Sequence, residues 1–209
     1  MAQSASRTKH NNKLSWIMVI SGILLMLYPL FTMAYAQYYQ ARLMAEVEEY
    51  QNPAIEYPVE SLRLPGEAEE VEKPPVKYMP DGAFMTIEIP ALDLYAVVLE
   101  GTDRPTLNKG PGWYRESALP GEGNTAIAGH RNTYGAWFRH VDKLNEGDEI
   151  IIGYDSKGYT YKVERVFPIA RDDWSVIEPC GYPALTLTTC HPVGSDRQRL
   201  VVRAALAEE

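Results

Sequence analysis

The sequence predicts an all-β domain, either a barrel or a sandwich, behind a long apolar helix at the N-terminus. Two observations support this prediction. From about Gly82 onward, short apolar and β-branched runs follow one another, each bounded by glycine, proline or a polar turn. Near the N-terminus, a single apolar segment lies in a stretch without charge between Lys13 and Arg42.

The predicted strands share this β-branched composition and end at turn residues. They cover residues 84–89, 94–99, 124–128, 149–152, 158–169, 184–190 and 198–205. Phe138–Leu144 has apolar residues at every third position, which predicts a short helix. About seven or eight short strands at hairpin-like spacing, with little helix between them, favour a barrel or a sandwich.

The apolar segment Leu14–Tyr35 is typical of a membrane-spanning helix. It is long enough for a helix of about 30 Å, and a membrane helix tolerates Pro29 as a kink. Basic residues precede the segment and glutamates follow it, so the positive-inside rule places residues 1–13 in the cytoplasm. The basic residues are Arg7, Lys9 and Lys13, and the acidic ones are Glu46, Glu48 and Glu49.

A cleaved signal peptide is the alternative to a retained anchor. Ala34-Tyr35-Ala36 fits a cleavage site with small residues on either side. The apolar run is longer than the core of an ordinary signal peptide, which favours the anchor. Either outcome exports the folded domain, so its cysteines meet a compartment that can be oxidising.

Between the apolar segment and the strands, the composition changes twice. Residues 36–50 could extend the membrane helix or form a short amphipathic one, and residues 51–80 are rich in proline and glutamate. That composition predicts an extended spacer. The alternative is a folded lid, because Tyr57–Leu64 has some apolar content. The expected organisation is a cytoplasmic tail (1–13), an anchor (14–35), a helix and spacer (36–80) and a catalytic domain (81–209).

Charge and cysteine content exclude two classes of protein. The 209 residues carry a formal net charge of -8, whereas a nucleic-acid binder usually needs a basic face. Two cysteines, Cys180 and Cys190, are too few for a disulfide-rich scaffold.

Three residues could together carry out nucleophilic catalysis. Cys190 ends a predicted strand, His130 follows another strand in a polar loop flanked by glycine, and Arg199 begins the last strand. A thiol, an imidazole and a guanidinium can serve as nucleophile, proton carrier and oxyanion ligand. The residues alone leave other interpretations open: a core cysteine, a Cys180–Cys190 disulfide, a solvated loop histidine and a surface arginine.

Metal binding by His130, Cys190 and His191 lacks any recognised ligand spacing. We therefore predict no metal and no cofactor.

The sequence around these residues resembles the sortases, which are cysteine transpeptidases of Gram-positive bacteria. The resemblance lies in TLTTC followed by HP, in RLVV downstream and in AGHRNTYGAWF upstream, and it runs from about Phe84 to Leu206. It implies an eight-stranded sortase-type β-barrel with short helices and an active-site groove.

The resemblance also implies a role for each candidate residue. Cys190 would be the nucleophile, His130 the general acid and base, and Arg199 the ligand of substrate and oxyanion. Arg197 is a rival for the last role, because it lies on the same face of a strand two positions earlier. Thr188 and Thr189, next to the cysteine, are expected to contact the substrate.

Within the family, GHRNTYGAWF and TLTTCHP are most similar to class E. Asn132 and Trp137 depart from the usual threonine and proline of that class. Class E implies a sorting signal of the type Leu-Ala-x-Thr-Gly (LAXTG) rather than Leu-Pro-x-Thr-Gly (LPXTG), and Tyr134 resembles the tyrosine associated with this preference. No Asp-Pro-aromatic triplet of the class C lid occurs in residues 36–83, which favours an open groove.

The implied activity is cleavage of a surface protein between Thr and Gly, followed by its transfer to an amine of a lipid-linked cell-wall precursor at the outer face of the cell membrane. The alternatives are a pilin polymerase that uses a lysine amine, a hydrolytic cysteine peptidase and a non-catalytic barrel that binds peptide or wall polymer. Cys180 is expected to be either a free loop cysteine or part of a redox switch.

Overall fold

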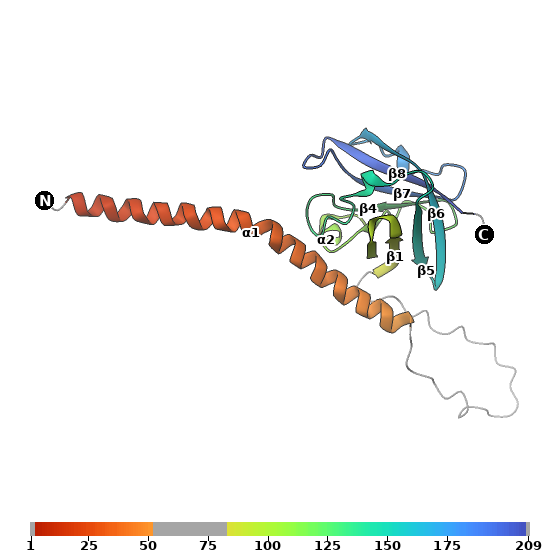
Figure 1. Ribbon diagram of the computed structural model, residues 1–209, viewed down its shortest axis with the longest axis horizontal. Helices are drawn as coiled ribbons and strands as arrows, with labels where there is room; N and C mark the ends of the chain where they lie inside the picture. The colour runs from red at the N-terminus through yellow and green to blue at the C-terminus, as the bar shows by residue number, and fades with distance from the viewer. Residues whose placement is uncertain (1–2, 52–82, 208–209) are drawn as a thin grey trace, which may run out of the picture.

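The computed structural model describes residues 3–51 and 83–207 and consists of one long helix beside a closed β-barrel (Figure 1). Helix α1 (Gln3–Gln51) is continuous, so residues 36–50 extend the apolar helix and form no separate one. The predicted spacer lies outside the described residues except for Gln51, as does the alternative of a folded lid.

The barrel closes in the strand order β1-β2-β3-β4-β7-β8-β6-β5, which confirms the expected eight-stranded architecture. Most neighbours are antiparallel, but β2–β3 and β4–β7 are parallel. The strands are β1 (Ala83–Ile89), β2 (Leu94–Glu100), β3 (Gly112–Trp113), β4 (Asn124–Ala128), β5 (Glu149–Tyr154), β6 (Lys157–Ala170), β7 (Ala184–His191) and β8 (Gln198–Leu206).

The sequence predicted these strands except β3, which is too short to show any periodicity. Short helices fill the connections: η3 (Pro90–Leu92), α2 (Arg104–Leu107), η4 (Val141–Lys143) and η5 (Ser175–Ile177). The helix predicted for Phe138–Leu144 was wrong in extent, because only η4 forms there. The Phe138 amide donates to the His130 carbonyl and closes a loop, and Leu144 is already extended.

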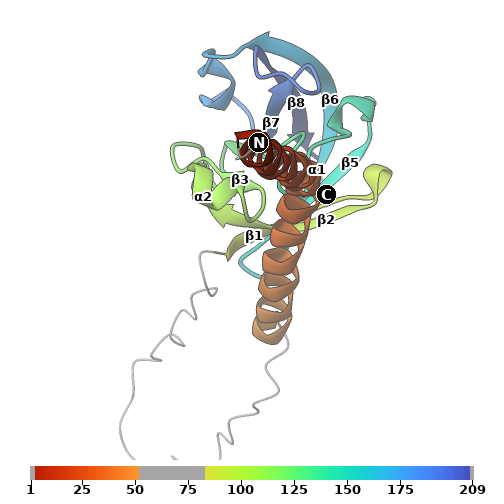
Figure 2. The same cartoon turned by 90° about the vertical axis from the view of Figure 1, so that its left-hand side faces the viewer.

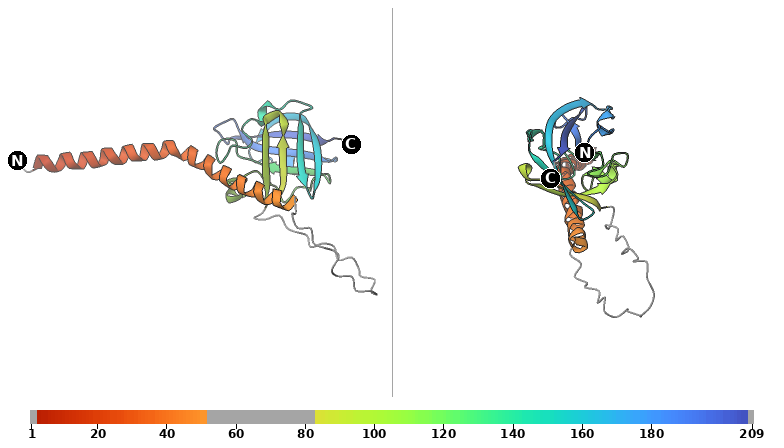
Figure 3. Two further views of the ribbon diagram at one scale, coloured as in Figure 1. Left: turned by 60° about the horizontal axis from the view of Figure 1, so that its bottom comes forward. Right: turned by 90° about the vertical axis from the view of Figure 1, so that its right-hand side faces the viewer.

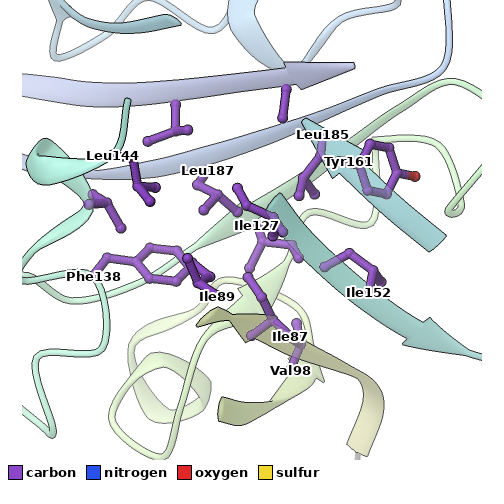
Figure 4. Close-up of a cluster of buried hydrophobic side chains, with 14 of the residues drawn as sticks. Ile87, Ile89, Val98, Ile127, Phe138, Leu144, Ile152, Tyr161, Leu185 and Leu187 are labelled. Carbon is purple, nitrogen blue, oxygen red and sulfur yellow. The ribbon is translucent and has the colours of Figure 1, made fainter. Parts of the chain in front are cut away.

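Alternating residues of the strands fill the barrel with aliphatic side chains (Figure 4). Ile87 and Ile89 of β1 meet Ile152 of β5 and Leu185 and Leu187 of β7 there, and all five are almost fully buried. Burial of an aliphatic side chain of this size contributes about 1.5–3 kcal/mol. This core makes the barrel a rigid scaffold for the loops at its ends.

Strand β2 is buried on both faces, which explains why its sequence is an apolar run without alternation. Ala96 and Val98 face the barrel core, whereas Val97 and Leu99 pack outward against Leu43 and Val47 of α1. Figure 3 shows the second half of α1 running along the barrel beside β1 and β2.

The C-terminal half of α1 docks on the barrel through one face of the helix. The buried residues of this half recur at helical spacing: Thr32, Ala36, Gln40, Leu43 and Val47. Before it, residues 14–31 are mostly apolar and almost all exposed, and α1 has a stretch with the length and composition of a membrane span. The helix bends once along its length (Figure 1), and Pro29, whose ring removes a helix hydrogen bond, accounts for the bend.

Candidate active site

The parallel pairing of β4 with β7 brings His130 and Cys190 to the same end of the barrel. The register pairs Ala128 with Thr188, and the Gly129 amide continues the pairing by donating to the Thr188 carbonyl at 3.1 Å. The Thr189 hydroxyl donates to the Gly129 carbonyl at 2.7 Å. His130 and Cys190 each lie two residues beyond the last paired positions, on neighbouring strands.

Antiparallel pairing with β8 adds the arginine. Cys190 lies directly opposite Arg199, and the Arg199 guanidinium donates to the Cys190 sulfur at 3.3 Å. Both side chains are half-buried, whereas Arg197 is exposed in the turn before β8. A guanidinium in this position can hold negative charge on the sulfur or on an oxyanion formed beside it. The geometry therefore favours Arg199 over Arg197.

His130 lies in a strained loop and has a ring nitrogen available for chemistry. Its Nε2 atom is buried and has no hydrogen-bond partner among the described residues. Its ring stacks on Tyr134, with 5.6 Å between centroids and 30° between planes. Tyr134 and Ala136 both have φ of 47°, a left-handed conformation that is unfavourable for residues with a Cβ and that clusters at functional sites.

The surroundings of His130 favour its neutral form. Burial lowers the pKa of His130, and the positive charge of Arg104 lowers it further. The imidazolium is then a stronger acid than an ordinary histidine, and this suits a group that must release a proton as well as take one up.

Arg131 holds the two loops of the site together, a role that the sequence did not reveal. It is buried, and its guanidinium contacts the Cys190 carbonyl at 3.3 Å, His191 Nδ1 at 3.1 Å and the Asp142 carboxylate at 3.0 Å. Because it joins the His130 loop, β7 and η4, it fixes the position of the histidine relative to the cysteine. This role depends on the burial of Arg131 beside His130. A sequence pattern does not show whether an arginine is buried, so the role could not be predicted.

Two aromatic residues that the sequence did not single out lie beside the same strand end. The Tyr114 hydroxyl hydrogen-bonds the Thr188 hydroxyl at 3.0 Å, and its pKa is raised chiefly by burial. Trp174, exposed in the β6–β7 connection, packs edge-on against Tyr114 with 6.3 Å between ring centroids. Together they give the outer surface next to β7 an apolar wall that an extended peptide could contact.

The structure gives the remaining predicted residues different surroundings. Thr188 and Thr189 are buried, and their hydroxyls are engaged within the protein, Thr188 with Tyr114 and Thr189 with the Gly129 carbonyl. Tyr134 lies between His130 and α1, where Tyr35 approaches it edge-on. A substrate contact by any of the three stays a prediction.

Cys180 and Cys190 are both free thiols, so the alternative of a disulfide between them is not formed. The Cys180 sulfur donates to the Tyr182 carbonyl, in the loop before β7 begins at Ala184. Cys190 lies near the other end of that strand, about 20 Å further along at ~3.3 Å per residue. Such a separation prevents a disulfide while β7 keeps its place in the barrel.

No group of three or more histidine, cysteine or carboxylate side chains that could hold a metal ion occurs among the residues that the structure describes.

Comparison with known proteins matches residues 87–207 to the sortase domain family. Sortase SrtE1 of Streptomyces coelicolor is 33% identical over 65% of this chain and 43% of its own length. Sortase A of Bacillus anthracis is 33% identical over 57% of this chain, which spans 58% of that relative. The solved structure of sortase E from Streptomyces avermitilis superposes with a TM-score of 0.55 at 38% identity, covering 60% of this chain and 88% of that one.

We predict that the imidazole of His130 titrates below its ordinary value of 6.5. Replacing Arg104 with alanine removes a nearby positive charge that opposes protonation, so the midpoint should move upward. It should remain below 6.5, because burial is the larger cause and persists. NMR titration of the full chain in detergent measures the midpoint directly.

Lys162→Ala, in the exposed part of β6 at the far end of the barrel, is the matched control and should leave the midpoint unchanged. A midpoint at or above 6.5 in the unaltered protein would contradict the electrostatic description of the site.

Proposed function

Because this chain belongs to the sortase family, we propose that it is a membrane-anchored cysteine transpeptidase that cleaves a sorting signal between Thr and Gly and passes the surface protein to an amine. The observation that carries this proposal is the adjacency of Cys190 and Arg199 on paired strands, with His130 at the end of the next strand. The family acts on surface proteins that bear such signals. The thioester mechanism and the identity of the amine are parts of the proposal.

In the first step, the Cys190 thiolate attacks the carbonyl carbon of the signal's threonine. The carbonyl oxygen becomes an oxyanion, and Arg199, already within hydrogen-bond distance of the sulfur, is placed to donate to it. The carbon–nitrogen bond then breaks. The glycine nitrogen takes a proton from the His130 imidazolium and leaves as a free amine, and the threonine carbonyl remains bound to Cys190 as a thioester.

In the second step, an amine attacks the thioester carbon and its proton passes to the now neutral His130. The carbon–sulfur bond breaks, the new amide leaves, and the Cys190 thiolate is restored. Water in place of the amine would give hydrolysis as a side reaction. We propose an amine of a lipid-linked cell-wall precursor as the acceptor, consistent with attachment of the domain to a membrane.

The signal is proposed to be of the Leu-Ala-x-Thr-Gly type. Support comes from the similarity to sortase E proteins and from the tyrosine in the His130 loop. Thr188 hydrogen-bonds the Tyr114 hydroxyl and Thr189 donates to the Gly129 carbonyl, so both are proposed to contribute to substrate binding by positioning the strand end that carries Cys190.

We further propose a single-pass topology with the N-terminus in the cytoplasm and the barrel outside. The basic residues before the apolar segment and the glutamates after it support this orientation. The burial of Thr32 and Ala36 supports a retained anchor, since cleavage after Ala36 would remove part of the buried face of α1.

Replacement of Cys190 with alanine should abolish cleavage of a labelled LAXTG peptide and ligation of its N-terminal part to an added amine. Cys180→Ala is the matched control and should retain activity, because this thiol lies beyond the other end of β7. Liquid chromatography with mass spectrometry identifies both products. Turnover by the Cys190 variant would refute the proposed function, and a hydrolysed product alone, across a panel of amines, would identify a peptidase.

Arg199 of β8 and Arg197 in the preceding turn offer a second matched pair. Arg199→Ala should lower kcat/KM by about 10²–10³-fold, as expected for loss of an oxyanion ligand. Arg199→Lys should recover only part of this loss, because an ammonium lacks the guanidinium fork. Arg197→Ala should stay close to the unaltered enzyme, and a larger effect at Arg197 than at Arg199 would reverse the assignment.

Tyr134→Leu should shift the preference between Ala and Pro at the second position of the signal. A shift of roughly 10-fold is expected if the Tyr134 ring contacts the side chain at that position. The measurement is competition between LAXTG and LPXTG peptides in one reaction, read by mass spectrometry. Tyr182→Leu, an exposed aromatic in the loop before β7, is the control. Selectivity that is the same in all three proteins would remove Tyr134 from the specificity residues.

A further inference from the structure

Helix α1 is attached to the barrel by a side chain that takes the place of a peptide group. The Val97 amide of β2 donates to Gln40 Oε1 at 2.8 Å, and Gln40 Nε2 donates back to the Val97 carbonyl at 2.9 Å. Strand β3 pairs with β2 only at Leu99 and Glu100, so Val97 lies on an edge that β3 does not reach. The Gln40 side-chain amide forms hydrogen bonds with the Val97 backbone amide and carbonyl that this edge would otherwise leave unpaired, and Gln40 is itself buried.

The surroundings of Gln40 are built around this contact. Its Nε2 also donates to the Lys109 carbonyl at 3.3 Å, and a Cβ at position 110 would collide with the same nitrogen, so Gly110 leaves the space that the amide occupies. Leu43 and Val47 extend the contact along the outer face of β2. Buried, reciprocal hydrogen bonds flanked by apolar packing fix the helix in one orientation on the barrel.

This orientation brings the membrane segment against the catalytic loop. Tyr35 of α1 meets Tyr134 edge-on at 6.2 Å between ring centroids, and the neighbouring Tyr28 side chain raises the pKa of Tyr134. Tyr134 in turn stacks on His130. The apolar helix and the catalytic histidine are thus separated by a single tyrosine ring.

The length of the apolar helix determines how close the barrel comes to the bilayer. The part between Lys13 and the contact at Tyr28 covers only about 21 Å at ~1.5 Å per residue. A bilayer core is ~30 Å thick, so the remaining thickness must be crossed by residues that already touch the barrel. The loops nearest to Tyr28 and Tyr35 therefore lie at the outer boundary of the membrane.

We propose that docked α1 holds the catalytic end of the barrel against the lipid headgroups, so that the mouth of the active site faces the membrane. The N-terminal half of α1 extends from the side where β7 and β8 are joined (Figure 1), and Figure 2 looks at the barrel from that side. The facing rim comprises the β7–β8 turn and the His130 loop, which are joined by the Gly194 amide donating to Asn132 Oδ1 at 3.1 Å.

The exposed groups of this rim fit a headgroup layer. Val193 is 54% exposed at the tip of the turn, and Arg197 is exposed beside it. The acidic Asp196 is paired with Arg171 at 3.0 Å. An apolar tip flanked by arginines is suited to the boundary between acyl chains and anionic headgroups.

The consequence for catalysis rests on the proposed function. An active site at this height would accept a sorting signal whose Thr–Gly bond lies close to the membrane surface. A signal held far above the membrane would have to bend back to reach Cys190.

The test measures the depth of the two barrel ends in the full chain, reconstituted in phosphatidylcholine–phosphatidylglycerol vesicles. Cys180 and Cys190 are replaced with alanine, and a fluorophore is attached to Val193→Cys at the rim or to Ser156→Cys in the exposed β5–β6 turn at the opposite end. Lipids with a nitroxide on the headgroup should quench the Val193 probe several-fold more than the Ser156 probe. Equal quenching of the two probes, or none at either, would overturn the proposal.

Gln40→Ala, made in the same background, tests the cause of the orientation. It should reduce quenching of the Val193 probe while near-ultraviolet circular dichroism shows that the barrel is still folded. Tyr38→Ala, on the exposed side of α1, should leave quenching unchanged. Unaltered quenching in the Gln40 variant would show that docking does not orient the barrel. Because these proteins lack the nucleophile, the result is independent of whether the chain proves to be a transpeptidase.

Discussion

The parallel pairing of β4 with β7 is the constraint on which the site depends. Parallel strands end at the same edge of a sheet, so the residues that follow Ala128 and Thr188 must emerge together. One of these residues is His130 and the other is Cys190. Strand β8 pairs antiparallel with β7, and the register of this pair places Arg199 directly opposite Cys190. The barrel core keeps these three strands in fixed register.

Contacts of Arg131, Tyr134 and Gln40 connect the site to helix α1. Arg131 locks the His130 loop to β7 from inside the protein, while Tyr134 supports it from the side of α1. The Gln40 amide fixes the helix on β2, so the orientation of the barrel relative to the apolar half of α1 is set by buried hydrogen bonds. Removal of the helix would therefore take away one wall of the histidine loop as well as the proposed anchor.

Apolar and β-branched runs bounded by glycine, proline or polar turns predicted most of the barrel, but other features depend on contacts that a sequence pattern does not contain. Strand β3 is defined by pairing over Gly112 and Trp113 alone. The sequence pattern placed Arg197 and Arg199 on one strand face, and only the structure shows that Arg197 lies in the turn while Arg199 pairs with Cys190. The docking of Gln40 and the burial of Arg131 join residues far apart in the chain. The roles of the cysteine, histidine and arginine came from a family resemblance, since the pattern alone favoured a buried cysteine.

The most direct test of the central claim is to detect the acyl-enzyme. The full chain in detergent would be mixed with an LAXTG peptide in the absence of an added amine, quenched in acid and measured as an intact protein by mass spectrometry. The thioester mechanism predicts a mass increase equal to the N-terminal part of the peptide up to threonine, mapped by fragmentation to Cys190 and removed by hydroxylamine. An adduct on Cys180, or none at all while cleavage proceeds, would contradict it.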